Sequence, residues 1–145
     1  MKKFFAIVLI FPMLVAVGLM FSACGEPKEP QINYQTDVTK MEFISQVIDS
    51  KEDQNLTMIG VIFASEPQSI SATYKGQQIN LEKEVVEDYE GPDSGVNGYQ
   101  YSYTLADKPT VTAYDASPIE ITTQFNGTHY KFTLTTDLID RILGM

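Results

Sequence analysis

Residues 119–134 read IEITTQFNGTHYKFTL and carry the clearest structural signal in the chain. Apolar and polar residues alternate on both sides of the dipeptide Asn126-Gly127, as in strands that bury one face. A two-residue type I′ turn needs positive φ at both central positions, and Asn-Gly is the pair best suited to it. The stretch therefore predicts a β-hairpin with strands over 119–125 and 128–134.

Upstream of this hairpin, most segments also have strand character. Residues 56–63 (LTMIGVIF) form a continuous apolar run of strand length, which is typical of a central strand buried on both faces. Residues 70–74 and 77–81 flank Lys75-Gly76, a tight-turn signal. Further strands are expected over 84–89, 99–105 and 110–114, with a Gly-rich loop over 91–98.

Two segments carry helical signals. Between Asp37 and about Asp53, the apolar residues Met41, Ile44, Val47 and Ile48 have the i, i+3, i+6, i+7 spacing of one helix face. At the other end of the chain, Thr136 or Asp137 can cap a short helix that Gly144 ends. Its apolar positions are Leu138, Ile139, Ile142 and Leu143.

These elements predict a single α+β domain over residues 37–145. Short strands joined by turns favour antiparallel pairing. We expect a curved antiparallel sheet of about seven strands, with the N-terminal helix and the short C-terminal helix on one face. A β-sandwich with peripheral helices is the alternative.

The N-terminus has the layout of a secretory signal. Met1-Lys2-Lys3 is basic, residues 4–21 (FFAIVLIFPMLVAVGLMF) carry no charge, and the small residues Ser22-Ala23 follow. The apolar run is long enough to raise the alternative of an uncleaved membrane anchor. Pro12 and Gly18 interrupt it, and no basic cluster follows it, which favours the cleaved signal peptide.

The motif Phe21-Ser22-Ala23-Cys24 resembles the lipobox of bacterial lipoproteins, usually Leu-Ala/Ser-Gly/Ala-Cys. The resemblance implies cleavage before Cys24, removal of residues 1–23 and a diacylglycerol on the Cys24 sulfur. Phe21 departs from the preferred Leu, and the resemblance covers none of the later domain. Residues 24–36 are expected to be an extended tether, since they include prolines and charges. The implied location is the cell envelope, facing periplasm or exterior, and Gly25 favours the outer membrane if the cell is Gram-negative.

The chain is acidic, with 10 Lys and Arg against 19 Asp and Glu. The leader contains two of these lysines and no acid, so the mature chain is more acidic still. Such a charge opposes nucleic-acid binding. The single cysteine excludes an internal disulfide and a Cys-based zinc site, and the lone His129 cannot supply a multi-histidine set. We therefore expect no metal, no cofactor and no catalytic residues.

The candidate binding face is the row Tyr99, Tyr101 and Tyr103. Residues spaced by two on a strand share one face. An exposed row would be an amphipathic platform for a protein or a glycan. A buried row would be part of the core, and its hydroxyls would then need partners.

The densest run of charge is acidic, over Glu82, Glu84, Glu87, Asp88, Glu90 and Asp93. Its spacing matches no calcium loop, so a solvated hairpin is the default interpretation. The expected function is a lipid-anchored, non-enzymatic binding or accessory module for protein or glycan. A structural envelope subunit and a small carboxylate-dependent hydrolase remain alternatives.

Overall fold

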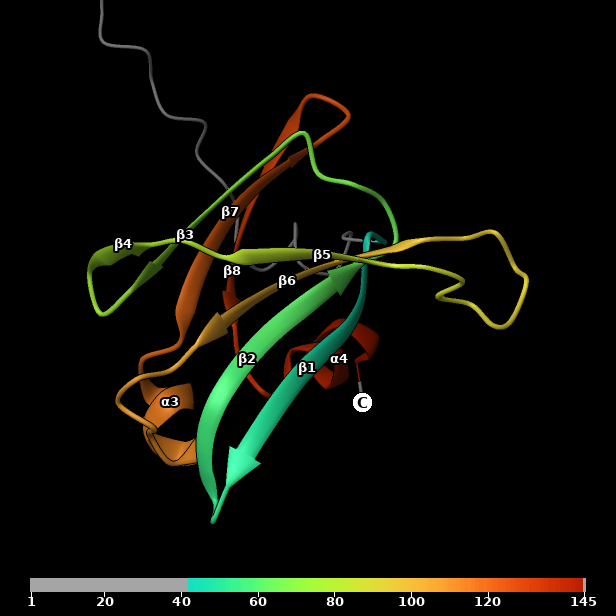
Figure 1. Ribbon diagram of the computed structural model, residues 1–145. Coiled ribbons are helices and arrows are strands. Elements are labelled where there is room, and N and C mark those ends of the chain that lie inside the picture. Colours follow the sequence, from blue (N-terminus) through green and yellow to red (C-terminus); the bar gives the residue numbers. More distant parts are fainter. Residues whose placement is uncertain (1–41, 145) are drawn as a thin grey trace, which may run out of the picture. The chain divides into compact units, whose positions relative to one another are not determined.

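A computed structural model describes residues 42–144, and Figure 1 shows their arrangement. Its strands are β1 (Ile44–Glu52), β2 (Asn55–Phe63), β3 (Ser69–Tyr74), β4 (Gln77–Ile79), β5 (Glu82–Val86), β6 (Gly98–Thr104), β7 (Ile119–Phe125) and β8 (Thr128–Leu134). Its helices are α3 (Val111–Ala116) and α4 (Leu138–Leu143). The described part of the chain is therefore rich in β-structure, with two short helices.

The strands form two four-stranded antiparallel sheets. Sheet A has the order β1-β2-β6-β5 and sheet B the order β4-β3-β7-β8. A single apolar core joins them: the Phe63 ring of sheet A lies 5.3 Å from Phe125 of sheet B, between ring centroids. This arrangement agrees with the β-sandwich alternative. The expected single curved sheet is wrong, because the strands divide into two layers.

Three hairpins have two-residue turns with positive φ at both central positions. In the turn between β7 and β8, φ is 49° at Asn126 and 77° at Gly127, which confirms the hairpin predicted there. Lys75-Gly76 joins β3 to β4 in the same manner, as predicted. The third turn, Asp53-Gln54, joins β1 to β2. Primed turns match the right-handed twist of the strands that they connect.

The helix predicted up to about Asp53 is wrong over the described residues, because β1 is a strand. Its pairing with β2 shifts between Ile44 and Gln46, where a β-bulge leaves Ser45 as an extra residue. A bulge changes which residues share a face. Ile44 pairs with Phe63 and Val47 pairs with Val61, so both point to the core side despite a spacing of three. The bulge therefore produced the spacing that resembles a helix.

The predicted central strand is confirmed in β2, which lies between β1 and β6. Gly60 is required at the middle of this strand. A Cβ atom added there would lie 2.7 Å from the backbone oxygen of Tyr101 and 2.8 Å from the Cβ of Ser102. The strands β2 and β6 can pair at this point only because Gly60 has no side chain.

Residues 110–114 were expected to be extended, and this prediction is wrong. Thr110 instead caps α3, where its Oγ1 accepts a 3.3 Å hydrogen bond from the Ala113 N–H. The β-branched Val111 and Thr112 favour strands, but the cap and the burial of Tyr114 stabilise one short helix. The C-terminal helix is confirmed in α4, and Gly144 ends it in the left-handed conformation, at φ 71°.

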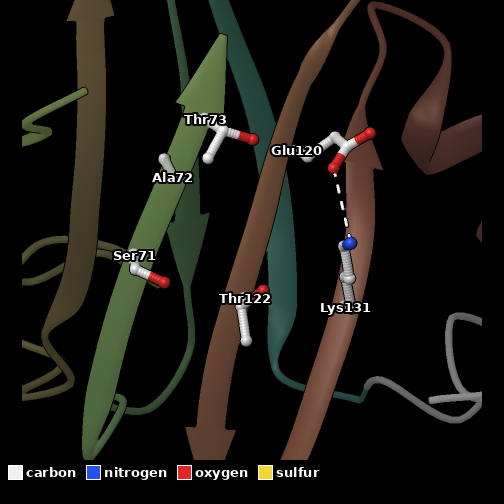
Figure 2. Close-up of a pocket in the computed structure, with 6 residues that line it drawn as sticks. All are labelled: Ser71, Ala72, Thr73, Glu120, Thr122 and Lys131. Atoms are coloured by element: carbon white, nitrogen blue, oxygen red, sulfur yellow. Dashed lines mark ion pairs between the residues drawn. The ribbon is translucent and has the colours of Figure 1, made fainter. Parts of the chain in front are cut away.

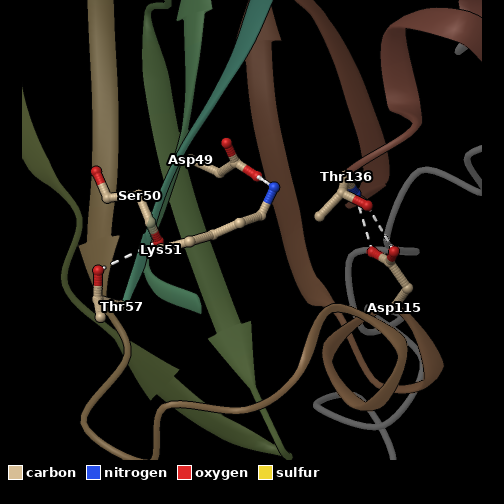
Figure 3. A network of polar contacts seen from close by, with 6 residues as sticks. All are labelled: Asp49, Ser50, Lys51, Thr57, Asp115 and Thr136. Atoms are coloured by element: carbon tan, nitrogen blue, oxygen red, sulfur yellow. Dashed lines mark hydrogen bonds and ion pairs between the residues drawn. The ribbon is translucent and has the colours of Figure 1, made fainter. Parts of the chain in front are cut away.

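Contacts between α3 and the segment before α4 fix the C-terminal part of the domain (Figure 3). The Asp115 carboxylate accepts hydrogen bonds from the Thr136 backbone N–H at 2.9 Å and from its hydroxyl at 2.6 Å. Figure 3 also shows an Asp49–Lys51 ion pair within β1 and a 3.2 Å hydrogen bond from Thr57 to the Ser50 carbonyl. Through its two hydrogen bonds to Asp115, Thr136 anchors the start of α4 to α3. Asp137 occupies the N-cap position of α4.

The predicted signal peptide, Cys24, the tether and the first residues of the predicted N-terminal helix lie outside the described residues. Within residues 42–144, no helix is both long and apolar enough to cross a membrane.

Candidate functional site

The tyrosine row lies on the inner face of β6, against the core. Tyr101 has only 6% of its surface exposed, and its ring lies 5.9 Å from that of Phe63. Tyr99 and Tyr103 are half-buried and pack against the same core. Burial raises the pKa of the Tyr101 hydroxyl. The three tyrosines therefore share one face, as the alternation predicted. This face packs against the core, which agrees with the buried row and not with the exposed platform.

Contacts with other side chains flank the tyrosine row at both of its ends. Lys83 of β5 lies with its Nζ 6.0 Å from the centroid of the Tyr99 ring, and it forms an ion pair with Glu66. At the other end, the Tyr103 ring lies 6.2 Å from the ring of Tyr74. Tyr101, in the middle of the row, belongs to the buried core between the two sheets.

The other residues considered from the sequence lie on the surface. His129 is exposed on β8, opposite Gln124 of β7. All six acidic residues of the run from Glu82 to Asp93 are exposed on β5 and the following loop. The Asp88 carboxylate accepts a 2.8 Å hydrogen bond from the Gly95 N–H, which closes this loop. Within the described residues, no three His, Cys, Asp or Glu side chains gather closely enough to hold a metal ion.

The outer side of sheet B carries a surface of polar side chains. Side chains alternate along β7 between the core and solvent, because strand neighbours point to opposite faces. The register brings six outward side chains into two rows across β3, β7 and β8: Thr73, Glu120 and Thr133 in one, and Ser71, Thr122 and Lys131 in the other. We refer to these six residues as the polar face.

The polar face contains a shallow pocket of about 100 Å³. Figure 2 shows that its side chains come from all three strands: Ser71 and Thr73 from β3, Glu120 and Thr122 from β7, and Lys131 from β8. The Lys131 ammonium lies 3.4 Å from the Glu120 carboxylate. The pocket thus presents hydroxyls that donate and accept, a carboxylate that only accepts and an ammonium that only donates.

Charge distinguishes the polar face from the rest of the domain. Glu120 and Lys131 carry opposite charges, so the six residues together are neutral. The acidic residues are concentrated elsewhere, above all on β5 and its following loop. A third row, formed by Ser69, Gln124 and His129, adjoins the face, and the Ser69 hydroxyl donates to the Gln124 side-chain oxygen at 3.5 Å.

Comparison with other proteins gives no assignment. No family model, no curated protein and no solved structure matches this chain.

Sequence reasoning missed the polar face. Its signal is the alternation of Ser69, Ser71 and Thr73 along β3, matched by alternate polar residues in β7. Each pattern alone describes an ordinary half-buried strand. Only the pairing of β3 with β7, which are separated by more than 40 residues, brings the hydroxyls onto one surface.

Proposed function

We propose that this protein is a lipid-anchored cell-envelope protein that serves as a non-enzymatic binding or accessory module, and that it contacts its partner through the polar face. The lipobox-like motif ending at Cys24 supports the anchor. Two or three acyl chains hold a small domain firmly on a bilayer, because each buried methylene contributes about 0.8 kcal/mol. Such an anchor would keep the domain beside the envelope components that it binds.

The observation that carries the proposal is the pocket in a neutral, hydroxyl-rich sheet face of an otherwise acidic domain. Ser and Thr lose little side-chain freedom when a ligand orders them, and the β-branched Thr is already restricted at χ1. The face is also supported from below by a buried layer, which includes Ala72 and Ile121. A rigid, preorganised surface reduces the entropic cost of binding.

A retention assay tests the proposal. Full-length protein in detergent is mixed with envelope fragments, which are then pelleted and assayed for bound protein. Thr122→Arg places a long charged side chain in the centre of the polar face and should abolish retention. Thr104→Arg is the matched control, since Thr104 is an exposed strand threonine on sheet A, and it should be retained like wild type.

The two variants must melt at temperatures close to that of wild type, so that loss of retention reports the surface and not unfolding. Equal retention of Thr122→Arg and wild type would overturn the polar face as the contact surface. If wild type itself were not retained, the proposal that the protein is a binding module would be wrong.

A further inference from the structure

The chemistry of the polar face also restricts what it binds. We infer that its ligand is an uncharged glycan chain, an inference that rests on the proposed function. Three properties of the face lead to this class of ligand: its charge, the chemistry of its polar groups and the size of its pocket.

Charge excludes most charged partners from this surface. The chain as a whole carries a formal net charge of −9, which repels polyanions. A polycation would be attracted to the exposed carboxylates of β5 and its loop and not to the neutral polar face. Glu120 and Lys131 already pair with each other, so a charged ligand would find no free opposite charge on the polar face. A neutral ligand avoids this problem.

The polar groups of the face suit a ligand that is rich in hydroxyls. Ser71, Thr73 and Thr122 each provide one donor and two acceptor lone pairs. Sugar hydroxyls have the same double capacity, so each can donate to one residue and accept from the next. The Glu120 carboxylate can accept from a sugar O–H or amide N–H, and charge-assisted hydrogen bonds of this kind are the stronger ones.

The pocket has room for one substituent of a sugar ring. Its volume of about 100 Å³ is several times the roughly 10–15 Å³ that a cavity needs to hold one water molecule. An acetamido group, with four non-hydrogen atoms, is of this order. Its N–H would face the Glu120 carboxylate, and its carbonyl oxygen would face the hydroxyls or the Lys131 ammonium.

The probe for this inference is chitohexaose, an uncharged chain of β-1,4-linked N-acetylglucosamine. Calorimetric titration into full-length protein in detergent should show saturable binding. The double variant Ser71→Ala/Thr122→Val removes two hydroxyls while nearly conserving volume. It should bind about tenfold more weakly, as expected for the loss of about two neutral hydrogen bonds. Thr104→Val removes a comparable hydroxyl from sheet A and should leave the affinity unchanged.

The outcomes separate this inference from the proposed function. Binding of chitohexaose that weakens only in the double variant supports the glycan ligand. Equal binding by the double variant and wild type overturns it. So does an absence of binding at millimolar chitohexaose, together with envelope retention that depends on Thr122 and disappears after protease treatment of the fragments. In that last case the polar face binds a protein, and the proposed function stands without the glycan.

Discussion

The hydroxyl of Tyr114 donates a 2.7 Å hydrogen bond to the backbone carbonyl of Leu134. The same oxygen accepts a 3.2 Å hydrogen bond from the Ile119 N–H. One buried side chain of α3 therefore joins the start of β7 to the end of β8. Burial raises the pKa of this hydroxyl, so it stays protonated and keeps its role as a donor.

Replacing Tyr114 by Phe should destabilise the domain, because two buried backbone groups lose a hydrogen-bond partner. The ring would remain, but the Leu134 carbonyl and the Ile119 N–H would be buried without this partner. Leaving a buried polar group unsatisfied costs about 1–3 kcal/mol, and a domain of this size loses about 4–8 °C in melting temperature per kcal/mol. Tyr130→Phe removes a hydroxyl from a half-buried ring and serves as the control in the same thermal melts. Equal melting temperatures for the two variants would contradict the bridging role of Tyr114.

Tyr101→Ala should be severely destabilising, because Tyr101 is enclosed between the sheets. Truncation of a large buried aromatic residue costs about 3–5 kcal/mol, a large fraction of the roughly 5–15 kcal/mol that holds a small domain folded. Tyr101→Phe keeps the ring and should melt near wild type. Chemical unfolding of both variants measures the difference. If Tyr101→Ala were as stable as wild type, the packing of the tyrosine row against the core would be wrong.

Asp107 should make the stability depend on pH in the acidic range. The Lys75 ammonium donates a 2.6 Å hydrogen bond to its carboxylate and lowers its pKa, and the Tyr74 hydroxyl donates a second at 3.1 Å. A carboxyl group whose pKa is lower in the folded chain than in the unfolded chain stabilises the fold at any pH above its unfolded pKa. This contribution is lost as the pH falls through the folded value, thus below about pH 4.

Asp107→Asn should accordingly flatten the decline in stability between about pH 5 and about pH 2. The difference at neutral pH should stay within about 1 kcal/mol, since Lys75 and Asp107 are 57% and 38% exposed and solvent screens them. Melting temperatures across this pH range test the prediction, with Glu90→Gln, an exposed loop carboxylate, as the control. Identical acid profiles for wild type and Asp107→Asn would refute it.

Cys24→Ser should abolish lipidation, because serine offers no thiol for the acyl-carrying thioether. The variant should stay unprocessed or be released from the membrane. Labelling with a radioactive fatty acid and partitioning into detergent measure both effects. Label that persists on the variant would rule out Cys24 as the lipid attachment site.

Local sequence was sufficient for the elements whose cause is local. Asn126-Gly127 imposes a turn through the φ angles that it tolerates, and the alternation on both sides follows from the two faces of a strand. The same reasoning predicted β2 and α4 at nearly their observed limits. It also placed Tyr99, Tyr101 and Tyr103 on one face, since that depends only on the strand period.

Tertiary pairing decided the rest. Ile44 and Val47 have a helical spacing, but they share the core side of a strand because a bulge at Ser45 forms when β1 pairs with β2. Thr110 caps a short helix whose Tyr114 is fully buried in the core. Ser71, Thr122 and Lys131 form one row only through the register of three strands. Burial and register arise from contacts between segments far apart in the chain, and a local pattern contains neither.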